Sequence, residues 1–185
     1  MKKINKLGMV ITKILEVFHW VAVALLIAAT ICSVAKPDWQ SYFVEPETTG
    51  DIVANLEVYG FEVITPLADG QIDSTTFLLF GIGSSIIMAV MAMVFRNLHL
   101  IFKKSENSTP FNKDNIRMLK EIGIFAIAVP VIGLIMSIII RLVAGVDSSE
   151  ISVDTNGFFM GIIILCLTQF FVHGAKLEED VDGLL

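Results

Sequence analysis

Three histidines and one glutamate are the residues whose types and spacing could do metal or haem chemistry. His19 lies inside the first apolar stretch, His99 and His173 lie near the ends of two others, and Glu16 stands three residues before His19. Imidazoles and carboxylates are metal ligands, histidine also ligates haem, and ionisable groups at membrane depth often mark functional sites. A metal or haem site formed by Glu16, His19, His99 and His173 is therefore one hypothesis.

An ordinary interfacial role for these residues is the interpretation that we favour. Histidines near a membrane surface can reach water, and Lys13, three residues before Glu16, can neutralise its carboxylate. Di-iron bundles use two Glu-x-x-His motifs, whereas this chain has one. Cys32 and Cys166 lack the spacing of a metal site. No Ser-His-Asp set, Walker loop or dinucleotide fingerprint is present, so we expect no cofactor and no enzyme activity.

The elements that position these residues follow from composition. The chain has 185 residues, of which 55% are hydrophobic and 17% charged, and its mean hydropathy is +0.75. Soluble domains are less apolar and more charged. Four stretches are long and apolar enough to cross a bilayer as helices, at about 14–35, 77–102, 122–143 and 157–175. The sequence predicts an all-α transmembrane fold, a four-helix membrane bundle, in a single domain 1–185.

Basic residues determine the expected orientation of these spans. Of the 13 lysines and arginines, all except Lys36 and Arg141 flank the spans on one side. The positive-inside rule makes that side cytoplasmic, so both termini are expected in the cytoplasm and the protein in the cytoplasmic (inner) membrane. The first stretch follows a basic segment, as a signal peptide does, but it exceeds the roughly 7–15 apolar residues of such a peptide. We expect an uncleaved helix.

The extracytoplasmic segment 37–74 is long for a simple connection. Asn55–Thr65 is rich in Val, Ile, Tyr and Phe and ends before Pro66, which predicts a strand, and Ile151–Thr155 is a second candidate strand. Together they predict a small extracytoplasmic β cap. The segment is also acidic, which fits either a sensing surface for cations or a solvated loop.

Small residues recur four apart in three of the predicted spans, and membrane helices associate closely at such positions. The pairs are Gly81 with Ser85, Gly133 with Ser137, and Gly157 with Gly161. The pairs lie in the outer halves of these spans, so we expect tight packing of the second, third and fourth spans in the outer leaflet. The same faces could also support a homo-oligomer.

Two polar stretches on the cytoplasmic side are organised. Thr109 is a natural N-cap, Pro110 suits a first helical position, and the residues that follow have the spacing of a short amphipathic helix. Its basic stripe would meet anionic lipid headgroups, and acids in the tail could pair with that stripe. The candidate partner-binding residues of the two stretches are Thr109, Pro110, Phe111, Asn115, Arg117, Leu177, Glu179, Asp180 and Asp182.

These stretches carry a resemblance. Four spans, Thr109-Pro110-Phe111 with Asn115, Arg117 and Leu119 before the third, and Gly174, Leu177, Asp180, Asp182, Gly183 and Leu184 after the fourth resemble the DUF2975 family of small bacterial membrane proteins. Members often end in an acid followed by Leu-Thr-Ile or Leu-Thr-Val, where this chain has Asp182-Gly183-Leu184-Leu185. The family has no established activity. The resemblance implies a gene neighbourhood with a small helix-turn-helix regulator, and hence a cytosolic regulatory protein as partner.

The functional hypothesis that we favour is a non-enzymatic membrane protein with a sensing or regulatory role. The first alternative is a subunit of a transporter or channel, although four spans without internal repeats are few for a self-sufficient transporter. The second is a metal- or haem-dependent redox protein using His19, His99 and His173. Direct nucleic-acid binding is not expected, because the basic residues lie where lipid headgroups would occupy them.

Overall fold

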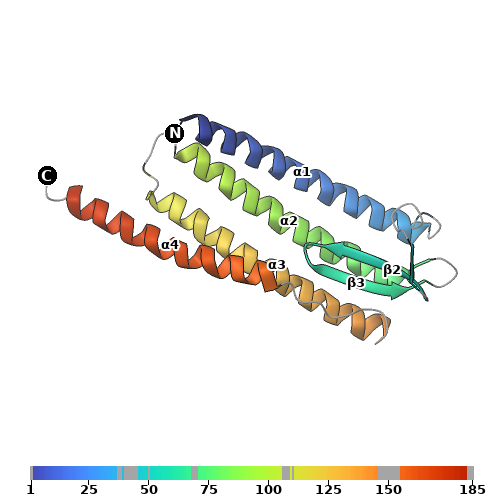
Figure 1. Cartoon of the computed structure of the whole chain (residues 1–185). Coiled ribbons are helices and arrows are strands. Elements are labelled where there is room, and N and C mark those ends of the chain that lie inside the picture. The colour runs from blue at the N-terminus through green and yellow to red at the C-terminus, as the bar shows by residue number, and fades with distance from the viewer. Residues whose placement is uncertain are drawn as a thin grey trace. The chain divides into compact units, whose positions relative to one another are not determined.

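Four long helices dominate the structure, a computed structural model that describes residues 2–36, 39, 46–49, 51–67, 71–105, 109, 111–145 and 155–182. The helices are α1 (Lys2–Ala35), α2 (Ser74–Lys104), α3 (Lys113–Ala144) and α4 (Thr155–Asp182). Three short strands, β1 (Pro46–Thr49), β2 (Asp51–Val58) and β3 (Phe61–Pro66), come between α1 and α2 (Figure 1). All four helices are long and apolar enough to cross a membrane, which confirms the four predicted candidate spans.

Each helix is longer than the apolar stretch that predicted it. The shortest has 28 residues and the longest 34, which at ~1.5 Å per residue gives about 42–51 Å, against ~30 Å of hydrocarbon. The extra turns are amphipathic or polar, and α3 includes the predicted amphipathic segment without a break. The predicted short amphipathic helix is thus the first part of α3.

The start of α3 differs from the prediction. The helix begins at Lys113, and the Asn112 side-chain oxygen accepts a hydrogen bond of 2.9 Å from the backbone N–H of Asp114. Asn112 therefore caps the helix, whereas Thr109 was expected to do so. The Thr109 carbonyl accepts a bond of 3.2 Å from the Asn112 N–H in the preceding turn. Pro110 lies outside the described residues.

The chain divides into two compact units. The terminal unit comprises Met1–His19, Val90–Ala128 and Asn156–Leu185, and the hairpin unit comprises Trp20–Ala89 and Val129–Thr155. Helices α1, α2 and α3 contribute residues to both units. From Asn156 onward α4 belongs to the terminal unit, so the hairpin unit is built from three helices and the sheet.

The sheet of the hairpin unit is antiparallel with strand order β1-β2-β3. Strands β2 and β3 are joined by Tyr59 and Gly60, which both have positive φ, at 50° and 74°. Positive φ at both central residues is the geometry of a tight hairpin turn. The prediction of one continuous strand over Asn55–Thr65 is therefore wrong, because the chain reverses at these two residues. In the other predicted strand, residues 151–154 lie outside the described residues and Thr155 begins α4.

Phe61 at the start of β3 is the centre of the hairpin unit's core. Its ring is 1% exposed and stacks on Phe80 of α2 with centroids 5.2 Å apart. A Cβ at Gly83 of α2 would lie 2.8 Å from the Phe61 ring, and one at Gly133 of α3 would lie 3.3 Å from the Phe61 Cβ. The strand thus packs against both helices where glycines leave space for it.

The small residues accept different partners from those predicted. Gly81 faces the side chain of Thr30 on α1, and Gly133 faces Phe61. Gly161 does pack against α3, as expected for spans three and four, but it meets Gly123 in the first third of that helix and not Gly133 or Ser137. The prediction that spans two, three and four pack on one another at these positions is therefore wrong at Gly81 and Gly133. A glycine creates space, but the sequence does not say which side chain fills it.

Replacing Phe61 with alanine tests this core. We expect Phe61→Ala to cost about 3–5 kcal/mol, because it empties a site that glycines shape on two sides. Thermal unfolding in mild detergent measures the loss. Phe158→Ala, the same change at a position that is 42% exposed, is the matched control and should have a much smaller effect. Equal losses for the two variants would contradict the packing described.

Candidate functional site

The helix crossing of α3 and α4 positions the rest of the terminal unit. A Cβ at Gly161 would lie 2.9 Å from the Gly123 carbonyl oxygen and 3.0 Å from the Ile127 backbone nitrogen. Neither backbone atom can move away cheaply. Beside this crossing, a Cβ at Gly123 would lie 2.8 Å from the Leu165 side chain. The two backbones therefore approach closely, as small residues allow in membrane helices.

A second contact joins the segment before α3 to the last turns of α4. The Phe111 ring lies 5.7 Å from that of Phe171, and a Cβ at Gly174 would be 2.5 Å from Phe111 Cε1. The Thr109 hydroxyl donates a hydrogen bond of 3.1 Å to Glu178 Oε2, across 69 residues of sequence. We call these residues, Thr109, Phe111, Phe171, Gly174 and Glu178, the loop–tail contact.

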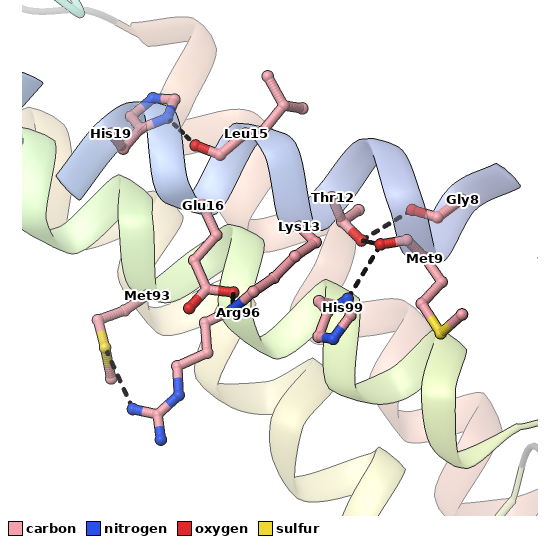
Figure 2. A network of polar contacts seen from close by, with 10 residues as sticks. All are labelled: Gly8, Met9, Thr12, Lys13, Leu15, Glu16, His19, Met93, Arg96 and His99. Atoms are coloured by element: carbon pink, nitrogen blue, oxygen red, sulfur yellow. Dashed lines mark hydrogen bonds and ion pairs between the residues drawn. The ribbon is translucent and has the colours of Figure 1, made fainter. Parts of the chain in front are cut away.

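One face of α1 is polar although the helix is apolar overall. Thr12, Glu16 and His19 are at most 8% exposed and follow one another at four- and three-residue steps. The Thr12 hydroxyl donates to the Gly8 carbonyl at 2.7 Å, and Lys13 Nζ lies 3.0 Å from Glu16 Oε2 (Figure 2). The Lys13 ion pair confirms the neutralisation expected for Glu16.

Hydrogen bonds to backbone carbonyls connect α1 and α2 within the terminal unit. His99 Nδ1 donates to the Met9 carbonyl at 3.0 Å, which Figure 2 shows reaching from one helix to the other. One helical turn farther along, Asn5 Nδ2 donates to the Phe102 carbonyl at 2.9 Å. The Phe102 ring fills the space above Gly8. Two hydrogen bonds from side chains to backbone carbonyls thus join α1 and α2.

A carboxylate and an amide connect α2 and α3. Asn97 is 5% exposed, and its Nδ2 donates to Glu121 Oε2 at 2.9 Å. The other carboxylate oxygen of Glu121 lies 3.8 Å from Arg117 Nε, a long ion pair. Nearer the start of α3, Lys104 pairs with Asp114. The α2–α3 interface therefore carries polar contacts at two levels.

The structure does not bring the four metal-ligand candidates together. Nδ1 of His19 bonds the Leu15 carbonyl at 2.8 Å, and its ring lies 4.8 Å from that of Phe95. His99 bonds Met9, Glu16 bonds Lys13, and His173 is exposed on α4. Among the described residues, no group of three or more His, Cys, Asp or Glu side chains is placed to hold a metal ion.

The candidate partner-binding residues divide into two groups. Thr109 and Phe111 lie in the loop–tail contact, while Asn115 Nδ2 reaches Ser105 Oγ at 3.5 Å and Arg117 reaches Glu121. Leu177, Glu179 and Asp180 are exposed on α4. Pro110 is outside the described residues, and Asp182 is described only as the end of the helix.

Sequence reasoning missed two members of the loop–tail contact. Phe171 lies in an apolar run where nothing distinguishes it from its neighbours. Glu178 was counted among the tail acids, which were expected to pair with Lys113, Arg117 or Lys120. Within the described part of the chain, no ion pair joins those groups, and Glu178 accepts from a hydroxyl instead.

Comparison of the chain with protein-family models, with curated proteins and with solved structures finds no match. The class of protein is therefore inferred from the fold. The chain is an integral membrane protein with four candidate spans, whose apolar helix faces contact lipid. The hydrogen bonds of His99, Asn5 and Asn97 to neighbouring helices lie in the terminal unit.

The buried amide between α2 and α3 is open to a direct test. We expect Asn97→Leu to lower stability by about 1 kcal/mol, because it removes one interhelical hydrogen bond inside the protein. Glu121→Gln keeps an oxygen for Asn97 and should cost less than Glu121→Leu. Urea or thermal unfolding in detergent compares the three. A larger loss for Glu121→Gln than for Glu121→Leu would argue against the hydrogen bond.

Proposed function

We propose that this chain is a non-enzymatic membrane protein of the DUF2975 family that senses or regulates, and that its terminal unit binds a cytosolic regulatory protein. The observation that carries the proposal is the loop–tail contact. The two stretches singled out by their sequence pattern, 69 residues apart at Thr109 and Glu178, are joined there by a hydrogen bond. They form one surface on which a partner could act.

The composition of the two units supports the expected orientation. Every lysine and arginine except Lys36 and Arg141 belongs to the terminal unit. The hairpin unit contains most of the acids of the chain, including those of segment 37–74. An excess of basic residues in the terminal unit is what the positive-inside rule associates with a cytoplasmic location.

The last turns of α4 offer a surface of mixed character. Leu177 is 66% exposed and Val181 58% exposed, and they stand four residues apart on one face. Glu179 and Asp180 are exposed beside them. An apolar pair flanked by carboxylates suits a basic amphipathic helix, in which apolar residues anchor and cations pair with the acids. A small helix-turn-helix regulator can present such a helix.

The loop–tail contact would decide whether this surface is presented. With Phe111 on Gly174 and Thr109 bonded to Glu178, α4 is fastened to the start of α3. A partner that binds the tail while the loop–tail contact is closed binds a helix that is already ordered, which favours its affinity. A partner that binds only when the contact is open must compete with Thr109 and Phe111 for the tail.

A photo-crosslinking amino acid at Leu177 tests the proposal in native membranes. We expect it to capture a helix-turn-helix regulator, and Glu179→Gln with Asp180→Asn should reduce the yield. Glu57→Gln with Glu62→Gln removes two acids from the hairpin unit and is the matched control. If the tail probe captures no regulator while the protein is folded, the proposed function is wrong.

Gly174→Leu tests the role of the loop–tail contact itself. The new side chain would displace Phe111, whose ring atoms would lie within 3.0 Å of its Cβ. Overpacking of this kind costs about 1–3 kcal/mol, so we expect the crosslinking yield from Leu177 to change at least about fivefold. Cys166→Leu, at an exposed position of the same helix, should leave it unchanged.

A further inference from the structure

The first turns of α3 carry three basic side chains on one exposed face. Lys113, Arg117 and Lys120 are spaced four and three residues apart and are all exposed. The Arg117 side chain is 69% exposed, and its contact to Glu121 is long, at 3.8 Å. Lys113 and Lys120 form no ion pair with any other described residue. The three groups are therefore available to a ligand.

Helix periodicity gives α4 a polar face that corresponds to this basic stripe of α3. Gly161 and Leu165 face α3, whereas Phe171 and Gly174 meet Phe111 on one flank of α4. Right-handed periodicity, about 100° per residue, places the opposite flank at positions 169, 173 and 176. Gln169, His173 and Lys176 occupy these positions and are exposed. Because α3 and α4 are antiparallel and meet at Gly123 and Gly161, this flank of α4 and the basic stripe of α3 lie on the same side of the helix pair.

The same two faces become apolar farther along each helix. Ile124 continues the α3 stripe and is 47% exposed, while Phe158 and Ile162 continue the α4 flank and are 42% and 40% exposed. A basic end followed by an exposed apolar stretch has the pattern of a surface at a membrane interface, where long cationic side chains reach outward from apolar surroundings.

We propose that Lys113, Arg117 and Lys120 of α3, together with Lys176 of α4, form a binding site for the phosphate headgroup of an anionic phospholipid. Gln169 and His173 add hydrogen-bond donors from α4, and Ile124, Phe158 and Ile162 accommodate the acyl chains. Arginine binds phosphate with two parallel hydrogen bonds, and lysine adds a point charge. The site is separate from the loop–tail contact and does not depend on the proposed function.

Acids near the site limit its affinity without neutralising it. Glu121 accepts a hydrogen bond from the neutral amide of Asn97 and keeps its negative charge, 3.8 Å from Arg117. Asp180 stands one helical turn beyond Lys176 and faces the same flank. Asp114, next to Lys113, is paired with Lys104. With Lys104 counted, five basic side chains face three acids, so the site stays net positive, and a zwitterionic lipid would occupy it less well than an anionic one.

Native mass spectrometry of the purified full-length protein tests this site. The probes are phosphatidylglycerol and phosphatidylcholine with identical acyl chains. We expect preferential retention of phosphatidylglycerol, and about a hundredfold weaker retention in the triple variant Lys113→Gln, Arg117→Gln, Lys120→Gln, since each cation near an anionic headgroup contributes roughly fivefold. Lys176→Gln should weaken retention less. Retention should also fall as salt concentration rises.

A triple variant with the same loss of charge elsewhere is the matched control. Lys6→Gln, Lys36→Gln and Lys103→Gln lie outside the two faces and should leave phosphatidylglycerol retention nearly unchanged. Circular dichroism verifies that both triple variants remain helical. Equal retention of the two lipids, or equal loss in the two triple variants, would overturn the proposal.

Two further outcomes identify other occupants of the same surface. If millimolar inorganic phosphate displaces the lipid completely, the site recognises free phosphate and the lipid assignment is wrong. If the protein forms a dimer that the Lys113, Arg117 and Lys120 changes dissociate, and no lipid is retained, the acidic tail of a second copy occupies the stripe. If the probe at Leu177 captures no regulator but phosphatidylglycerol is still retained, the proposed function is contradicted and the lipid site is not.

Discussion

Close approach of two backbones at Gly123 and Gly161 is the constraint on which the terminal unit depends. Lipid gives apolar helices no reason to associate, so their association depends on van der Waals contact and on hydrogen bonds that water does not contest. At this crossing the contact is so tight that a Cβ at Gly161 would lie within 3.0 Å of two backbone atoms of α3. The crossing fixes the register of α4 against α3, and from Gly161 to Gly174 the helix advances about 20 Å. Phe171, Gly174 and Glu178 meet Phe111 and Thr109 because that register is set.

Polar side chains that bond between helices add a second constraint on the helix register. His99 and Asn5 bond carbonyls of the neighbouring helix, and Asn97 bonds Glu121. Each such pair would leave an unsatisfied buried group if the helices slid by one turn, which makes the observed register the preferred one. The individual bonds are modest. Together they exclude alternative packings more than they add stability, which explains why polar residues in otherwise apolar helices lie at interfaces.

The sequence predicted the helices well and their contacts poorly. Length and hydropathy located all four spans, because backbone groups in lipid must bond within the helix. The ion pair of Lys13 with Glu16 was also predicted, since it is local. The hairpin was missed, because Tyr59 adopts a positive φ that tyrosine seldom takes. The partners of Gly81 and Gly133 were missed because a glycine specifies a space, whereas the residue that fills it depends on distant chain segments.

The composition of the two units has a consequence for biogenesis. From Asn156 onward α4 adds nothing to the hairpin unit, whose residues all lie within 20–155. During synthesis, Phe61 can therefore take its place between α2 and α3 before the fourth helix has left the ribosome. The terminal unit must wait, because Gly161 and Glu178 come late in the chain. The hairpin unit would mature first, and the α4 contacts would close last, as the final step that completes the newly inserted protein.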